Sequence, residues 1–98
     1  MAMQPGRYEK RSPEAVAVML TSPDPVIPTE LTLTENISSR GARVVTKGLW
    51  SANDPLVIKS LEGDLQSEAR VIYRQPMREN VYAVGLQLLA PRGNWRGK

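Results

Sequence analysis

Six short stretches of hydrophobic residues recur along the chain, separated by segments with proline, glycine and asparagine. Most of them alternate hydrophobic with polar positions, which is the two-residue period of a β-strand with one buried face. Residues 15–20 are instead continuously apolar and rich in valine, which is typical of a strand buried on both faces. The pattern predicts strands at residues 15–20, 29–35, 42–47, 56–61, 66–74 and 81–89.

The segments between these stretches have the composition of loops and turns. Residues 21–29 contain three prolines, each of which fixes φ and removes a backbone hydrogen-bond donor. Residues 62–64 and 76–80 are short and polar, and residues 48–55 form a loop that holds Trp50. No proline falls inside a predicted strand, and this favours an all-β barrel or sandwich.

Alternation also assigns side chains to the two faces of the last two strands. In the fifth strand, one face carries Ala69, Val71 and Tyr73. The opposite face carries Arg70 and Arg74. In the sixth strand, one face comprises Tyr82, Val84, Leu86 and Leu88, while Gly85 lies on the other. We expect the arginine face to be exposed. We expect Trp50, Tyr73 and Tyr82 to be core or barrel-end residues.

The length of the chain favours one domain built as a closed barrel. Ninety-eight residues with 41% hydrophobic content suffice for a single core. An open six-stranded sheet would leave one face and two edges unprotected, and no amphipathic helix is long enough to cover them. We therefore predict an all-β fold, a six-stranded antiparallel β-barrel.

The composition argues against catalysis. The chain has no cysteine and no histidine, so disulfides, thiolate metal sites and the usual general base are absent. We expect a binding protein rather than an enzyme, with no catalytic residue and no metal site. No apolar run has the length of a membrane span, and residues 1–6 lack the hydrophobic segment of a signal peptide. These features predict a soluble, cytoplasmic protein without membrane insertion.

Positive charge is concentrated at the two ends of the chain. The net charge is +3, of which residues 1–11 carry +2 and residues 92–98 carry +3, leaving −2 for residues 12–91. This distribution favours an anionic partner held by the ends. For residues 92–98 we prefer the simpler interpretation, a basic tail that aids solubility.

Residues 36–41, Asn-Ile-Ser-Ser-Arg-Gly, join the second and third predicted strands and are referred to below as the hexapeptide. Asparagine, serine and glycine are common in turns, because the first two hydrogen-bond to nearby backbone and glycine adopts a positive φ or permits close approach. The same residues also offer an amide, two hydroxyls, a guanidinium and backbone N–H groups, which could cradle an anion. Both interpretations remain open at this point.

A second motif precedes the first strand. Arg7 and Arg11 are four residues apart, and the same spacing recurs at Arg70/Arg74, Arg74/Arg78 and Arg92/Arg96. The spacing alone is therefore uninformative. Only the first copy lies in an irregular segment before the first strand and is followed by an Asn-x-Ser-x-x-Gly loop after the second.

This combination resembles the PilZ domain, a bacterial receptor module for cyclic di-GMP. The resemblance rests on Arg-x-x-x-Arg at 7–11, Asn-x-Ser-x-x-Gly at 36–41, and a last strand similar to the family's Tyr-x-Val-Gly ending. It implies a six-stranded antiparallel β-barrel, in agreement with the strand pattern. Asn36 stands where many members have Asp. The C-terminal helix common in the family has little room here, so the closing barrel end is covered by Trp95, by a partner, or by nothing.

The resemblance also implies roles for individual residues. Arg7 and Arg11 would bind the phosphates and guanine Hoogsteen edges of cyclic di-GMP, because a guanidinium fork matches both. Asn36 would meet a guanine through its amide. Ser38 would bind a phosphate or brace the loop, and Gly41 would permit close approach of the ligand. Arg40 and Gly85 are secondary candidates, and no cofactor other than this ligand is implied.

The predicted organisation has three parts: a flexible N-terminal segment at residues 1–12, a PilZ-like barrel at 13–91 and a basic tail at 92–98. The predicted function is a cyclic di-GMP sensor that orders its N-terminal segment on binding and signals through a protein partner. The alternative is a ligand-free PilZ-like adaptor. A DNA or RNA binder ranks low, because two Trp, three Tyr and no Phe form no clustered aromatic strand for stacking bases.

Overall fold

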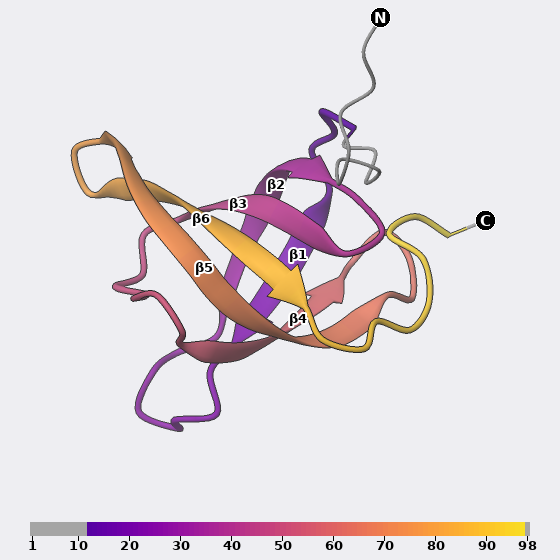
Figure 1. Cartoon of the computed structure of the whole chain (residues 1–98), viewed down its shortest axis with the longest axis horizontal. Helices are drawn as coiled ribbons and strands as arrows, with labels where there is room; N and C mark the ends of the chain where they lie inside the picture. Colours follow the sequence, from indigo (N-terminus) through magenta and orange to yellow (C-terminus); the bar gives the residue numbers. More distant parts are fainter. Residues whose placement is uncertain (1–11, 98) are drawn as a thin grey trace, which may run out of the picture.

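The six hydrophobic stretches form six strands in the computed structural model, which describes residues 12–97 (Figure 1). The strands are β1 (Ala17–Thr21), β2 (Glu30–Ile37), β3 (Gly41–Thr46), β4 (Pro55–Ser60), β5 (Gln66–Arg78) and β6 (Val81–Leu88). They pair antiparallel in the order β1-β2-β3-β6-β5-β4, and β4 pairs with β1 to close the barrel. The predicted six-stranded antiparallel barrel is confirmed. The flexible segment predicted at 1–12 lies, apart from Ser12, outside the described residues.

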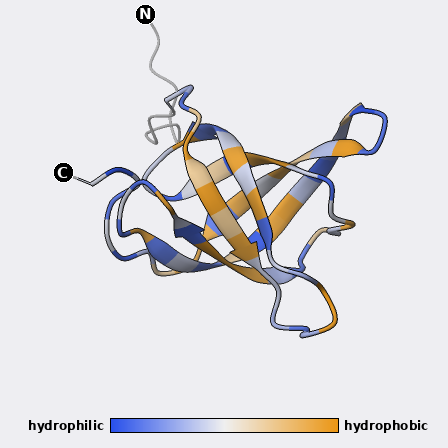
Figure 2. Cartoon of the chain, turned by 180° about the vertical axis from the view of Figure 1, so that it is seen from behind, coloured by the Kyte–Doolittle hydropathy of each residue, from blue (hydrophilic) through white to orange (hydrophobic). Residues whose placement is uncertain are grey.

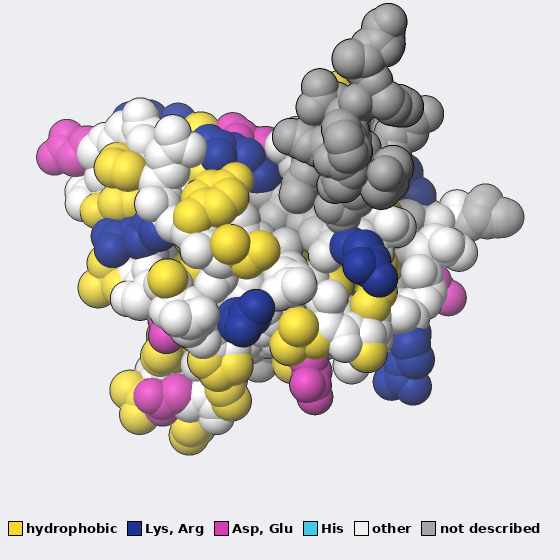
Figure 3. All heavy atoms as spheres, viewed as in Figure 1, with side chains coloured by type: hydrophobic (Ala, Val, Ile, Leu, Met, Phe, Trp, Pro, Cys, Tyr) yellow, Lys and Arg dark blue, Asp and Glu magenta, His cyan; other side chains and the backbone are white. Residues whose placement is uncertain are grey.

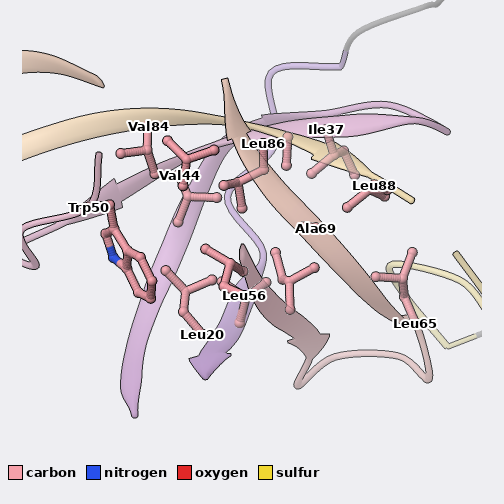
Figure 4. Packing of buried hydrophobic residues seen from close by; sticks show 14 of the residues in the cluster. Leu20, Ile37, Val44, Trp50, Leu56, Leu65, Ala69, Val84, Leu86 and Leu88 are labelled. Atoms are coloured by element: carbon pink, nitrogen blue, oxygen red, sulfur yellow. The ribbon is translucent and has the colours of Figure 1, made fainter. Parts of the chain in front are cut away.

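Alternate side chains along the strands fill the barrel interior (Figure 4). The entry to β1 follows the two-residue period, with Val16, Val18 and Leu20 fully buried and Ala17 and Met19 only half-buried. The prediction that this strand is buried on both faces is therefore wrong. The outer face of a closed barrel lies toward solvent, and even a continuously apolar strand presents half of its side chains there.

In β2 the leucines face outward and a threonine faces inward. Leu31 and Leu33 are 66% and 50% exposed, whereas Thr34 is 2% exposed. The Thr34 hydroxyl accepts a hydrogen bond from Val16 N at 2.8 Å and donates one to Glu14 O at 2.6 Å. These bonds satisfy backbone groups where the chain enters the barrel, which offsets the cost of burying the hydroxyl.

The β5–β6 hairpin is longer than predicted and projects beyond the barrel (Figure 1). β4 pairs with β5 only as far as Arg70, so the rest of β5, through Arg78, pairs with β6 alone. Pro76 lies in this outer part of β5, and the prediction of proline-free strands is wrong. Proline is tolerated at this position because it lies on an edge strand, where the side of the backbone that lacks an N–H can face away from the neighbouring strand. Asn80 closes the hairpin with a φ of 61°.

Tyr73 lies on the outer face of the barrel and not in the core. A register shift between Val71 and Tyr73 interrupts the alternation of β5, and Tyr73 is 41% exposed. Its ring covers Gly85 of β6, where an added Cβ would lie 2.1 Å from Tyr73 Cε2. The expectation that Tyr73 is a core or barrel-end residue is therefore wrong, whereas Trp50, 5% exposed, is a core residue as expected.

Trp95 covers one end of the barrel. The indole is half-buried and packs against the core cluster, as one of the sequence-based alternatives anticipated. The segment around it is fixed by backbone bonds, including Gln66 N to Arg92 O at 2.9 Å and Leu65 N to Asn94 O at 2.9 Å. Arg96 forms ion pairs with Glu14, which precedes β1, and with Glu62, which follows β4. Residues 12–97 contain no helix that is long and hydrophobic enough to cross a bilayer.

We expect Gly85→Ala to lower the free energy of unfolding by about 1–3 kcal/mol, because the new methyl group must displace the Tyr73 ring. Urea denaturation measures this. In a Tyr73→Ala background the same substitution should cost below about 0.5 kcal/mol, since the clash is gone. Gly97→Ala is the matched control, because a Cβ there would meet Glu62 O at an ordinary 3.5 Å. Equal losses at Gly85 in both backgrounds would contradict the contact.

Candidate functional site

The hexapeptide forms the tight connection between β2 and β3. Asn36 ends β2 together with Ile37, and Gly41 begins β3. Ser38 organises the turn between them: its backbone N–H donates to Gly41 O at 2.9 Å, and its hydroxyl accepts from Gly41 N at 3.0 Å and from Arg40 N at 3.3 Å. Ser38 is only 7% exposed. The turn interpretation of Ser38 is thus confirmed by its bonds.

Gly41 does not have the positive φ that the sequence allowed for. The positive-φ residues of the described chain are Asn53, Asn80 and Gly93. Gly41 instead pairs with Gln87 of β6 in regular strand geometry. The remaining sequence-based reason for a glycine here is close approach of another group to its backbone.

The chain entering the barrel lies directly against the hexapeptide. Ser12 N donates to Ile37 O at 2.9 Å, and Ile37 N donates to Ser12 O at 3.0 Å, forming an isolated antiparallel bridge. Ile37 lies between Asn36 and Ser38, so the bridge places Ser12 beside two candidate ligand residues. Ser12 follows Arg11 in the sequence. Arg7 and Arg11 themselves lie outside the described residues.

The C-terminal segment supports the hexapeptide from another side. Trp95 Nε1 donates a hydrogen bond to Ser38 O at 2.9 Å. The same indole packs against the core, so the turn is tied both to the entry segment and to the covered barrel end. A loop held at several points keeps its polar groups in place before a ligand arrives, which lowers the cost of binding.

Arg43 lies beside Asn36 on the outer face, and the sequence analysis missed it. A register shift between Thr34 and Asn36 aligns Asn36 with Arg43 of β3. Arg43 Nε contacts Glu35 Oε1 at 2.7 Å, and its Nη1 donates to Tyr73 Oη at 3.0 Å. The hydrogen bonds that Arg43 donates, first that to Glu35 and then that to Tyr73, raise the pKa of Arg43. No sequence signal pointed to Arg43, because the register shift that aligns it with Asn36 is not visible in the sequence.

The other candidates lie as follows. Asn36 is half-buried at the end of β2, Arg40 is exposed in the turn, and the backbone N–H groups of Arg40 and Gly41 both donate to the Ser38 hydroxyl. Gly85 pairs with Arg43 across β3 and β6, and Tyr73 covers it. The glycine is thus required by the Tyr73 ring, and its contact with a ligand stays a prediction. In the part of the chain that the structure describes, no group of acidic side chains is arranged to hold a metal ion.

Comparison with known proteins supports the fold. No family model matches the sequence, and no curated protein matches it at a significant level. Among solved structures, the chain is similar to the Bacillus subtilis inhibitor of motility (MotI/DgrA), with a TM-score of 0.72 and 20% identity. The match covers 92% of this chain and 44% of that chain, so the chain spans less than half of that protein's length. At this identity the likeness shows the fold, and it supports a PilZ-like barrel.

We expect Ser38→Ala to destabilise the protein by about 1–2 kcal/mol, because the backbone groups of Arg40 and Gly41 lose their bonds to the hydroxyl. Ser39→Ala is the matched control: Ser39 is exposed and adjacent, and its loss should change stability by less than about 0.5 kcal/mol. Chemical denaturation of both variants measures the difference. Equal stability of the two variants would contradict the bracing role of Ser38.

Proposed function

We propose that this protein is a cyclic di-GMP sensor of the PilZ type that acts through a protein partner. In this proposal the ligand binds between the hexapeptide and the segment that carries Arg7 and Arg11. Binding orders the N-terminal segment against the barrel and creates a new surface for the partner. No bond is made or broken, so the protein acts as a bacterial cytoplasmic adaptor rather than an enzyme.

The pairing of Ser12 with Ile37 is the observation that carries the proposal. The two motifs are separated in the sequence by the 24 residues 12–35, which lie between Arg11 and Asn36. Ser12, the residue after Arg11, nevertheless lies beside the hexapeptide, since both backbone bonds of the bridge join it to Ile37. A site built from the two motifs therefore requires no rearrangement of the barrel.

The chemistry of the two motifs suits a cyclic dinucleotide. Guanidinium groups form bidentate bonds with phosphate oxygens and with the O6/N7 edge of guanine. The Asn36 amide can bond to a guanine edge, and a glycine at position 41 leaves room for the ligand near the backbone. The positive charge of residues 1–11 favours an anion at this end of the chain.

The output of the sensor is proposed to be a protein contact. The described residues form one closed barrel, and a change at its surface can act on a partner. The structurally similar protein is an inhibitor of motility. That likeness supports a regulatory role, and a ligand-free adaptor is the outcome expected if cyclic di-GMP does not bind.

We expect Arg7→Ala and Arg11→Ala each to weaken cyclic di-GMP binding by at least about tenfold, because each arginine makes more than one charge-assisted hydrogen bond. Isothermal titration calorimetry measures the affinity, and unchanged unfolding curves show that the barrel is intact. GTP and single-stranded RNA titrated in parallel test selectivity.

Arg70→Ala is the matched control for these variants. Arg70 is exposed on β5, belongs to neither motif, and its Nη2 donates to Gln87 Oε1 at 2.7 Å. Gln87 pairs with Gly41, so Arg70 is a surface arginine near the hexapeptide whose guanidinium is already bonded within the barrel. Its loss should leave the affinity within about twofold, since an exposed charge that makes no direct contact with the ligand is screened by salt. Equal losses at Arg70, Arg7 and Arg11 would indicate diffuse attraction. Wild-type affinity in both N-terminal variants would refute the assigned site.

A further inference from the structure

A groove lies at the end of β2 and β3 away from the hexapeptide. It has a volume of about 730 Å³ and is bounded by the β1–β2 loop, the start of β2, the end of β3 and the β3–β4 loop. The β5–β6 hairpin contributes Arg78 and Val81. The volume falls within the range of roughly 300–1,000 Å³ that is typical of ligand pockets.

The rim of the groove carries exposed apolar side chains. Leu49 is 81% exposed, Leu31 66% and Ile27 44%, and all three line the groove. Val26, next to Ile27 in the β1–β2 loop, is 84% exposed. Hydrophobic side chains are visible over this loop at the lower left of Figure 3, and the loop has an apolar section in Figure 2. Apolar surface of this kind, extending past a groove, is typical of protein interaction sites.

The charges around the groove balance. Lys47 and Arg78 are the cations and Glu30 and Asp54 the anions that line it. Glu30 accepts hydrogen bonds from Thr46 Oγ1 at 2.6 Å and from Lys47 N at 2.9 Å, so its carboxylate is committed to the loop. A groove whose lining carries equal numbers of positive and negative side chains gives no preference for a nucleotide or another strongly charged ligand.

Trp50 forms part of the groove and has an unsatisfied polar group. Trp50 is only 5% exposed, and its Nε1 has no hydrogen-bond acceptor among residues 12–97. In Figure 4 the indole nitrogen lies on the side away from the labelled core residues. Gly48 lies over this nitrogen, since an added Cβ there would be 2.8 Å from Nε1. Buried unsatisfied donors are rare in native proteins and call for a physical explanation.

We infer that this groove binds an extended apolar segment of a partner protein. A leucine-like side chain of the segment fits the apolar walls of the groove. The main-chain carbonyls of the segment offer hydrogen-bond acceptors to the β3–β4 loop, whose Gly48 covers Trp50 Nε1. Flanking residues of a segment would also cover Leu49 and Val26, which a ligand confined to the groove would leave exposed. At the groove the start of β2 pairs with β1 and the end of β3 pairs with β6, because the β2–β3 ladder runs only from Thr34 and Val44 to Ile37 and Ala42.

The inference rests on the protein partner of the proposed function but not on cyclic di-GMP. The groove is therefore tested without the nucleotide. Failure of the groove to bind the apolar segment then leaves cyclic di-GMP binding untouched, and failure to bind cyclic di-GMP leaves the groove untouched. The two tryptophans provide the measurement. The indole N–H signal of Trp50 reports on the groove, while that of Trp95, bonded to Ser38 O, is an internal reference.

The experiment is an NMR titration of the full chain with the blocked dipeptide N-acetyl-leucyl-leucinamide, with signals assigned from Trp50→Phe and Trp95→Phe. The expected result is a saturable shift of the Trp50 indole signal with the Trp95 signal unmoved. Leu49→Glu should raise the Kd about tenfold through loss of an apolar contact. Leu89→Glu, at a 47% exposed leucine outside the groove, should leave it unchanged.

Four outcomes would overturn the inference. The first is no Trp50 shift up to the solubility limit of the dipeptide, and the second is an equal shift with the blocked glutamate dipeptide. A shift that follows protein concentration alone would assign the groove to a second copy of this chain. Binding of octanoate with no binding of the leucine dipeptide would assign it to small apolar ligands.

Discussion

Closure of the sheet by the pairing of β4 with β1 is the constraint on which the rest of the structure depends. It gives every barrel strand a neighbour on both sides and leaves an interior narrow enough for side chains to fill. The interior is built mainly from valine, leucine, isoleucine and alanine. Among the large aromatic rings, Trp50 belongs to the core beside the groove, whereas Trp95 lies on the closing end and Tyr73 on the outer face.

The sequence was sufficient to predict the strands, because closure requires turns at regular intervals and proline, glycine and asparagine mark them. Two features could not be read from alternation. Leu31 and Leu33 point outward because Thr34 is needed inside to bond Val16 and Glu14, a contact between residues far apart in the chain. Tyr73 changes face because β5 is irregular, and a period of two carries no information about such a shift.

In the candidate site, too, some features could be predicted from the sequence and others could not. The spacing Asn-x-Ser-x-x-Gly identified the hexapeptide, and turn chemistry accounts for Ser38. The supports came from pairing that sequence does not reveal: Ser12 on Ile37, Trp95 on Ser38, and Arg43 beside Asn36. Together they place the candidate ligand residues at one end of the β2–β3 pair and the apolar groove at the other. In the proposed function, ligand and partner therefore bind at opposite ends of the same two strands.

Hydrogen exchange with and without cyclic di-GMP tests the central claim most directly, because it observes the ligand, the N-terminal segment and the hexapeptide together. The account predicts slowed exchange at residues 7–11 and 36–41 at saturating ligand, with the barrel strands otherwise little changed. Ordering costs about 1–2 kcal/mol per fixed residue, which the charge-assisted contacts of the two arginines must offset. Protection of residues 7–11 that is already complete without ligand, or absent at saturation, would contradict the account.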